Sequence, residues 1–216
     1  MHLRDTPFLQ EAPAVPEGVD RVRLAAPRAP GVPSLLEDAT TPHIASPEVV
    51  ADEATQTLRL YYHGLDGFGV QRTRVAVSSD GLHFEAREEV LAPPCRRVFR
   101  YDGWGYGLAM PGYFVRSRDG LNDFEQGPRC FEPDMRHAAL WRRRDRLSVF
   151  WTRVGDAPER ILVSDQDLDR DWVHWRDARA CEVYRLERIW EGASLPGVVL
   201  TWPARVVHSA LHAVRA

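Results

Sequence analysis

Short runs of β-branched and aromatic residues dominate the middle of the chain, and turn residues separate them. The runs are LRLYYHG (58–64), RVAVSS (74–79), GYFVRS (112–117), LSVFWTRV (147–154) and RILVS (160–164). Gly, Asp or Pro bounds each run, as is usual for β-strands. No segment shows the periodicity of an amphipathic helix over three or more turns. The pattern of hydrophobic and polar positions therefore predicts a mostly β region from residue 43 to about residue 185.

A short polar motif recurs after these runs. It reads SSDGLHFE at 78–85, SRDGLNDFE at 117–125 and, more loosely, SDQDLDRDWVHW at 164–175. Asp and Ser side chains can accept hydrogen bonds from the backbone of a tight turn, and Gly supplies a positive φ. We therefore predict that Asp80, Asp119 and Asp167 form structural joints between strands rather than three copies of a reactive site.

The spacing of the motif indicates the fold. Leu82 and Leu121 are 39 residues apart, and Leu121 and Leu168 are 47 residues apart. A repeat of 40–50 residues with about four strands is typical of a β-propeller blade. The sequence thus predicts an all-β fold with about three blades, at about 43–90, 91–133 and 134–185.

The two ends of the chain differ from the blades. Residues 1–42 hold seven prolines and no sustained periodicity. Because Pro removes backbone donors, this segment is predicted to be an irregular linker, a wrapping arm or disordered. Residues 191–216 lack the joint and the blade spacing, and they are predicted to form an atypical C-terminal tail after the propeller region of 43–190.

Composition and charge exclude several classes of function. The formal net charge is −3, which favours neither nucleic acid nor an anionic membrane as a partner. No stretch is long and apolar enough to span a membrane, and the N-terminus has no signal-peptide core, so we expect a soluble, cytoplasmic protein. Cys95, Cys130 and Cys181 are widely spaced and give no disulfide framework and no zinc motif. No nucleotide-binding, serine-hydrolase or zincin motif occurs, and no cofactor is predicted.

Two blades carry a resemblance to a known group of enzymes. HIASPEVVADEATQTLRLYYHG, followed by VAVSSDGLHFE, resembles the blades of five-bladed propeller glycosidases, the glycoside hydrolase family 43-like superfamily. The opening with Ala45, Pro47 and Glu48 is similar to the A-P-D-V that begins a blade in that group. RHAALWRRRDRLSVFWTRVGDAPERILVS resembles a later blade of the same kind. The resemblance covers roughly residues 43–192.

The resemblance implies hydrolysis of a glycosidic bond by carboxylates that face a central pocket. Such chemistry needs one carboxyl that donates a proton and a second that is ionised. Glu48 matches the acidic position of the blade opening, and Glu191 in WEGA is similar to the glutamate that carries the general acid of the group. The resemblance thus makes Glu191 the candidate acid and Glu48 a second carboxylate or a modulator of its pKa. The alternatives are an edge acid for Glu48 and an ordinary loop acid for Glu191.

The sequence also departs from the pattern of the group. Met110 stands where an acidic residue is expected at a blade opening, and Ala193 replaces a proline after the candidate acid. The first blade of the group, which carries the catalytic base, has no counterpart in residues 1–42. We therefore expect an incomplete copy of the propeller, whose open blade edges could associate with one another.

Two histidines and an aspartate are candidate contacts of a carbohydrate ligand. His43 and His137 occupy matching places in two blades, so both could line the axis. There they could contact a sugar or hold a central ion such as calcium through water, or they could be structural. Asp134 could complete this polar cluster or only pair with Arg136.

Two aromatic residues in the stretch YDGWGYG (101–107) are further candidates. Trp104 and Tyr106 could stack on the apolar face of a sugar ring, or they could belong to the core of a blade. Three functional hypotheses follow from the sequence: a glycoside hydrolase, a non-catalytic glycan-binding propeller, and a truncated product without activity. The sequence identifies neither the sugar nor the linkage.

Overall fold

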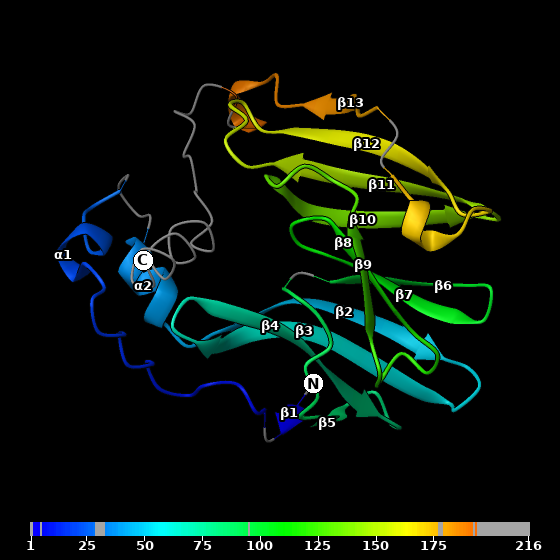
Figure 1. Cartoon of the computed structure of the whole chain (residues 1–216), viewed down its shortest axis with the longest axis horizontal. Helices are drawn as coiled ribbons and strands as arrows, with labels where there is room; N and C mark the ends of the chain where they lie inside the picture. Colours follow the sequence, from blue (N-terminus) through cyan, green and yellow to red (C-terminus); the bar gives the residue numbers. More distant parts are fainter. Residues whose placement is uncertain are drawn as a thin grey trace.

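The computed structural model describes residues 2–4, 6–28, 33–94, 96–176, 179–191 and 193. Almost all of its regular structure is β, arranged in three antiparallel sheets that follow one another along the chain (Figure 1). Each of the four consecutive strands in a sheet pairs with the next in sequence, which is the arrangement of a propeller blade. The prediction of an all-β, propeller-like fold with about three blades is confirmed.

The strand bounds define the three blades. The first blade contains β2 (Ile44–Asp52), β3 (Thr57–Gly67), β4 (Val70–Ser78) and β5 (His83–Ala86). The second contains β6 (Arg97–Tyr101), β7 (Trp104–Ala109), β8 (Tyr113–Ser117) and β9 (Glu125–Arg129). The third contains β10 (Met135–Arg143), β11 (Arg146–Arg153), β12 (Arg160–Asp167) and β13 (Cys181–Arg185).

The first strand of each blade is the innermost one. β6 lies beside both β2 and β10, and β2 and β10 are the mutually facing strands of the first and third sheets (Figure 1). Side chains at the beginnings of these strands can therefore meet although they are about 50 residues apart in sequence. This convergence positions the candidate site described below.

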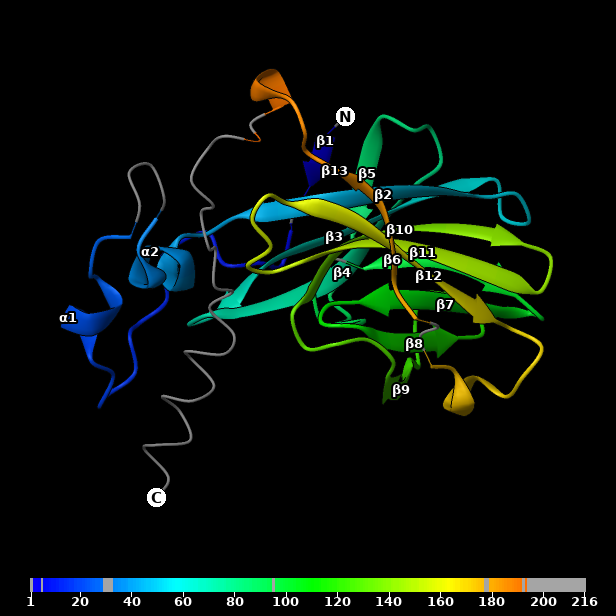
Figure 2. The same ribbon diagram turned by 90° about the horizontal axis from the view of Figure 1, so that it is seen from above.

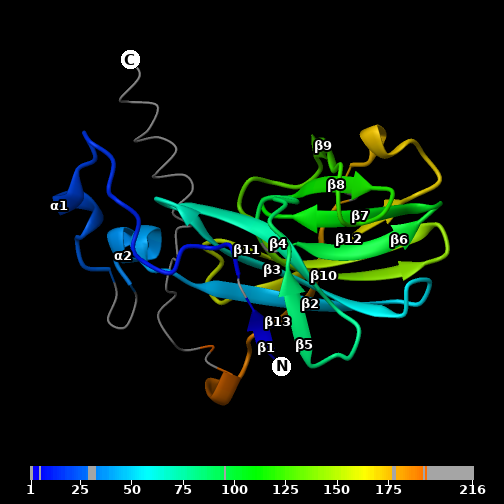
Figure 3. The same ribbon diagram turned by 90° about the horizontal axis from the view of Figure 1, so that it is seen from below.

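The N-terminal segment is more ordered than its composition predicts. Strand β1 (His2–Arg4) pairs in parallel with β5 and adds a fifth strand to the first sheet (Figure 3). Two short helices follow, α1 (Arg21–Leu24) and α2 (Leu35–Thr40), and both lie beyond one end of the sheets (Figure 2). Of the alternatives that the sequence left open, the described part of this segment corresponds to a wrapping arm.

Phe8 makes one of the contacts that attach this arm to the first blade. The ring of Phe8 is buried, and its centroid lies 5.5 Å from that of Tyr62 in an edge-to-face arrangement. It sits directly on the backbone of β3 at Gly64, where an added Cβ would be only 2.6 Å from the ring. Only glycine leaves room for Phe8 at this point, so the arm and the blade are matched in sequence.

The first two joints have the structural role that the sequence predicts. One carboxylate oxygen of Asp80 accepts hydrogen bonds from the backbone N–H groups of residues 82 and 83, each at 2.8 Å. Asp119 accepts from the N–H groups of residues 121 and 122 at 2.7 and 2.9 Å. Gly81 and Gly120, which follow these aspartates, both have a φ of +75°. Both carboxylates are thus occupied within the turns.

The third joint uses a different residue from the predicted one. Asp171, rather than Asp167, accepts a hydrogen bond from the backbone N–H of Val173 at 3.2 Å and caps a 3-10 helix, Trp172–His174. Asp171 precedes the buried Trp175 by four residues, just as Asp80 precedes the buried Phe84. The prediction for Asp167 was therefore wrong. DWVHW lacks the glycine that marks the other two joints, so the sequence did not indicate which aspartate caps this turn.

The main hydrophobic core lies between the second and third blades. It is rich in aromatic side chains, and its buried members include Tyr106, Phe114, Phe131, Trp151, Trp172 and Trp175. A smaller core, which includes Tyr61, Val75 and Val115, lies between the first and second blades. The blades are therefore held to one another by apolar burial as well as by the polar contacts around the axis.

Candidate functional site

An arginine at the beginning of β6 connects the inner strands of all three blades. The Nε atom of Arg97 donates a hydrogen bond to the backbone carbonyl of Ala138 on β10, at 3.0 Å. Its Nη1 atom lies 3.9 Å from the carboxylate of Glu48 on β2. Because Arg97 itself belongs to the second blade, its guanidinium marks the place where the three blades converge.

Glu48 is the carboxyl group at this point. Its side chain is 21 % exposed, and both of its oxygens lie 3.2 Å from the backbone N–H of Val98. Burial raises the pKa of Glu48, and the N–H of Val98 and the positive charge of Arg97 offset this effect only in part. Glu48 therefore binds a proton more readily than an exposed glutamate does.

Three histidines lie in the same region, and Arg97 acts on two of them. Burial, with smaller contributions from His43 and Arg97, lowers the pKa of His63 to about 4. Burial also lowers the pKa of His137, again with a contribution from Arg97. The ring centroids of His43 and His63 are 6.0 Å apart. At neutral pH, His63 and His137 are therefore neutral imidazoles, each with one donor and one acceptor nitrogen.

Irregular backbone at the beginnings of β2 and β10 shapes this region. The ladder between β2 and β3 shifts register between Ala45 and Glu48, and Ser46 has a φ of +50°. The ladder between β10 and β11 shifts between Arg136 and Ala138, and the residue between them, His137, has a φ of +43°. Such bulges redirect side chains at the end of a strand. A bulge with a positive φ thus occurs at the beginning of two of the three inner strands.

The structure brings together some of the residues that the sequence analysis selected. Glu48, His43 and His137 all belong to this region, which we call the axis cluster and define as His43, Glu48, His63, Arg97 and His137. The sequence analysis did not identify Arg97 or His63. His63 lies in a strand-like run of the sequence, and Arg97 lies in a stretch with no motif, so only the pairing of distant strands reveals them.

Asp134 has a different partner from the one considered. Arg136 pairs with Glu159 at 2.7 Å. The Nε atom of Arg153 lies 3.6 Å from one oxygen of Asp134, and the other oxygen is buried and accepts no hydrogen bond within the described part of the chain. Asp134 thus keeps an acceptor available, and its role as a ligand contact stays a prediction.

Glu191 lies on the outer side of the third blade, in a 3-10 turn formed by Ile189–Glu191. One of its oxygens accepts hydrogen bonds from the backbone N–H groups of Glu187 and Arg188, at 2.9 and 3.0 Å. These bonds lower the pKa of Glu191, which favours the ionised carboxylate rather than a proton donor. Its assignment as the acid stays a prediction, and the rest of the predicted tail, 192 and 194–216, lies outside the described residues.

The two aromatic candidates lie away from the axis cluster. Tyr106 is 4 % exposed and belongs to the core between the second and third blades, where its ring lies 5.2 Å from that of Phe99. The ring of Trp104 carries the guanidinium groups of Arg116 and Arg118 at 4.0 and 3.6 Å. Most of the surface of both rings is thus covered by protein, and neither substrate contact is tested.

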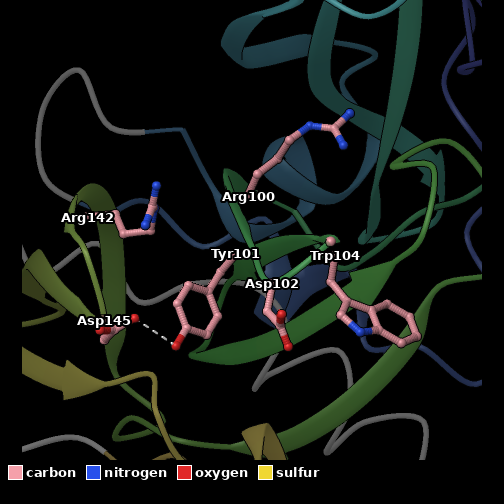
Figure 4. A pocket seen from close by; sticks show the side chains of 7 residues that line it. Arg100, Tyr101, Asp102, Trp104, Arg142 and Asp145 are labelled. Atoms are coloured by element: carbon pink, nitrogen blue, oxygen red, sulfur yellow. Dashed lines mark hydrogen bonds between the residues drawn. The ribbon is translucent and has the colours of Figure 1, made fainter.

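A hollow of about 450 Å³ lies beside Trp104, at the far ends of β6 and β10 (Figure 4). The lining comprises Arg100, Tyr101, Asp102, Gly103, Trp104, Arg142 and Asp145. The hydroxyl of Tyr101 donates a hydrogen bond to Asp145 at 3.1 Å and so joins the second and third blades. This hollow is open and is lined by residues at hairpin tips. In the axis cluster, by contrast, burial shifts the pKa values of Glu48, His63 and His137.

No metal site accompanies the axis cluster. Within the ranges that the structure describes, no three His, Cys, Asp or Glu side chains come together as ligands of an ion. The same part of the chain contains no helix that is long and apolar enough to cross a membrane.

The first prediction concerns the pH dependence of folding at His63, which is 4 % exposed. Its folded pKa of about 4 is below the usual value of 6.5, so protonation favours the unfolded chain. The contribution of the neutral His63 imidazole to the free energy of unfolding is complete above pH 6.5 and is lost as the pH falls towards 4. This contribution amounts to at most about 3 kcal/mol. Urea unfolding at pH 7.5 and pH 4.5 should show a smaller loss of stability for His63→Gln than for the wild type. His174→Gln, at an exposed position, is the control. A loss of stability for His63→Gln as large as that of the wild type would contradict this prediction.

Comparison with known proteins reveals one similar sequence and several similar folds. No protein-family model matches the chain. The uncharacterized protein R118 of Acanthamoeba polyphaga mimivirus is 32 % identical in an alignment of 179 positions that covers 74 % of this chain and 50 % of that protein. The chain thus spans about half the length of this curated relative.

The similar solved structures are enzymes that act on glycosidic bonds. A GH32 β-fructofuranosidase of Bombyx mori has a TM-score of 0.52 at 17 % identity, over 66 % of this chain and 38 % of that one. A thermostable family-43 glycoside hydrolase has a TM-score of 0.51 at 14 % identity, over 70 % and 56 %. A β-1,2-mannobiose phosphorylase of Listeria innocua has a TM-score of 0.50 at 11 % identity, over 64 % and 58 %. At these identities the likeness is one of fold.

Proposed function

We propose that this chain binds a carbohydrate at the axis, through the side chains of Glu48, Arg97 and His137. The observation that carries the proposal is the position of Arg97, which contacts the inner strands of all three blades and has Glu48 beside it. The solved structures with a similar fold, which include a β-fructofuranosidase and a β-1,2-mannobiose phosphorylase, support the same class of ligand.

The chemistry of the axis cluster suits a neutral polyhydroxylated ligand. A sugar hydroxyl both donates and accepts hydrogen bonds. A neutral imidazole such as that of His137 can do the same, whereas Glu48 accepts when ionised and Arg97 only donates. Because Glu48 and Arg97 carry opposite charges at close range, the cluster selects strongly for neither anions nor cations. Directional hydrogen bonds would therefore govern recognition.

Binding without catalysis is the form of the function that the described residues support best. Hydrolysis of a glycosidic bond requires two carboxyl groups that are about 5–9.5 Å apart. Glu48 is the one carboxyl group in the axis cluster as defined above, and the carboxylate of Glu191 is engaged by the backbone of its own turn.

Hydrolysis is the second candidate, and the raised pKa of Glu48 favours it. A buried carboxyl whose pKa is raised can act as a general acid. In this form of the proposal, Glu48 and Glu191 are the candidate carboxyl groups. A further carboxyl group could be supplied by residues beyond those described.

A paired measurement of binding and turnover separates the two candidates. The purified chain would be screened against a panel of soluble oligosaccharides that includes β-1,2-mannobiose and sucrose, with intrinsic Trp fluorescence to detect binding and reducing-sugar release to detect turnover. Binding without release supports the glycan-binding propeller, and release supports the hydrolase. A folded sample that neither binds nor cleaves any member of the panel would reject both.

The second prediction concerns Glu48→Gln, which keeps the size of the side chain and removes its charge. For a sugar found in the screen, we expect at least a tenfold weaker binding, because a hydrogen bond to a charged group contributes about 1.5–3 kcal/mol. Glu85→Gln, at an exposed position on the outer strand β5, is the matched control and should bind like the wild type. Unchanged binding by Glu48→Gln, with the variant folded, would exclude Glu48 from the site.

A further inference from the structure

A second candidate site lies between the first and second blades. It is a cavity of about 50 Å³. Its lining comes from the inner and second strands of both blades and from the joint at Gly120, and includes Asp52, Arg59, Tyr61, Arg96 and Arg100. At the 10–15 Å³ that one enclosed water requires, the cavity has room for roughly three to five water molecules.

Arg96 is the most unusual residue in this lining. It is 2 % exposed, and its Nε and Nη1 atoms are buried and make no hydrogen bond within the described part of the chain. Its guanidinium lies between two rings, 4.9 Å from the centroid of Tyr61 and 4.1 Å from that of Phe124. The rings attract the cation, but they leave the in-plane N–H groups without acceptors. A buried charge without an acceptor is costly, so a missing partner is indicated.

The fold makes specific room for this side chain. At Gly107 on β7, an added Cβ would lie 2.1 Å from the Nε atom of Arg96 and 2.9 Å from its Cγ and Cδ atoms. The glycine therefore lets the arginine pass directly over the second sheet. An apolar side chain at this position would avoid the free-energy cost of burying a charge, so the buried arginine indicates a specific role.

The charges around the cavity are predominantly positive. Arg59 is also buried and donates hydrogen bonds to Asp52 and to the carbonyl of Asp119, yet its Nε atom has no acceptor among the described residues. Arg100 lies 3.5 Å from the same Asp52 carboxylate. Two of the three lining arginines thus share one carboxylate, and Arg96 forms no ion pair within the described residues.

Glu48 is the nearest further acid, and it acts on Arg96 only at a distance. Its charge raises the pKa of Arg96, while burial has the larger and opposite effect and lowers that pKa to about 10. Glu48 makes no ion pair with Arg96 within the part of the chain that the structure describes, and its own oxygens face Val98. Even with Glu48 ionised, three positive charges face two negative ones.

We infer that the cavity is a binding site for a monatomic anion, with chloride as the physiological ligand, held between Arg96 and Arg59. Chloride accepts hydrogen bonds from several N–H donors at once and fits a space of a few water molecules. Because the donors come from the first and second blades, the ion stabilises the packing of these two blades and is independent of any sugar at the axis.

The test is the dependence of thermal stability on chloride at constant ionic strength. The wild-type chain would be melted in sodium gluconate that is replaced stepwise by sodium chloride or sodium bromide. When chloride reaches ten times its Kd, the ratio of folded to unfolded chain should increase roughly 11-fold, with a corresponding rise in Tm. Arg96→Met, which keeps the length of the side chain and removes the guanidinium, should lose this dependence. Arg142→Met, at an exposed position in another blade, should keep it.

A second measurement does not depend on the folding of any variant. The ³⁵Cl NMR line of a chloride solution should broaden in the presence of the wild-type chain, and bromide should reverse the broadening by competition. A Tm that is the same in gluconate and chloride, together with no ³⁵Cl broadening, would overturn the inference and show that the cavity holds water. An equal chloride response of Arg96→Met and the wild type would also overturn it.

Discussion

Replacement of Trp175 by alanine is expected to lower the free energy of unfolding by about 3–5 kcal/mol, as is usual for a large aromatic side chain in a core. Trp175 is 1 % exposed, and its ring lies 4.8 Å from that of Tyr106 and 5.2 Å from that of Phe114. Its Nε1–H donates a hydrogen bond to the carbonyl of Arg170 at 3.1 Å. The substitution leaves a cavity between the second and third blades, and urea unfolding measures its cost.

Trp141→Ala is the matched control for this prediction. Trp141 lies on β10, is 54 % exposed, and stacks only with the guanidinium of Arg143 at 4.1 Å. Loss of such a surface contact is expected to change stability by about 0.5–1 kcal/mol. Equal destabilisation of the two variants would mean that Trp175 is not a core residue. It would then contradict the packing of the third blade against the second that is described above.

Replacement of Asp52 by alanine is expected to destabilise the chain by a similar amount, about 3–5 kcal/mol. Asp52 and Arg59 form an ion pair in which each side chain is 7 % exposed. The variant leaves the Arg59 guanidinium buried beside two other arginines, without its carboxylate partner. The comparison is made by urea unfolding in a gluconate buffer, because an anion that enters the cavity would offset part of the loss.

The control for Asp52 is an ion pair at the surface. Glu125 pairs with Arg116 at 2.9 Å, and its side chain is 52 % exposed. Exposed pairs contribute about 0.2–1 kcal/mol, so Glu125→Ala should have a small effect. A loss for Asp52→Ala that does not exceed the loss for Glu125→Ala would mean that the inner pair is not buried in solution.

Local interactions explain why much of the fold could be predicted from the sequence. The joints at Asp80 and Asp119 depend on hydrogen bonds to backbone groups only two and three residues away, so a short motif identifies them. The third joint was placed at the wrong aspartate because Asp171 makes a similar contact without the accompanying glycine. The sequence left a linker, a wrapping arm or disorder open for the N-terminal segment, because its order depends on a distant contact, that of Phe8 with Gly64.

The candidate site could be predicted only in part, because its contacts are long-range. Glu48 was selected from a blade-opening motif, and the structure gives it the pKa shift of a buried carboxyl. Arg97 was not selected, since its importance arises from the carbonyl of Ala138, which lies 41 residues further along the chain. Tyr106 illustrates another limit: the sequence left a ligand contact and a place in the core of a blade both open, and only the packing of distant strands shows that the ring is buried.

The measurement that tests the carbohydrate site most directly is a crystal structure of the chain with a bound oligosaccharide from the screen. We predict density for the sugar at the axis, with its hydroxyl groups in hydrogen-bond contact with Glu48, Arg97 or His137. Density confined to the hollow beside Trp104 (Figure 4), at the opposite end of β6, would contradict the proposal and move the binding site to the hairpin tips.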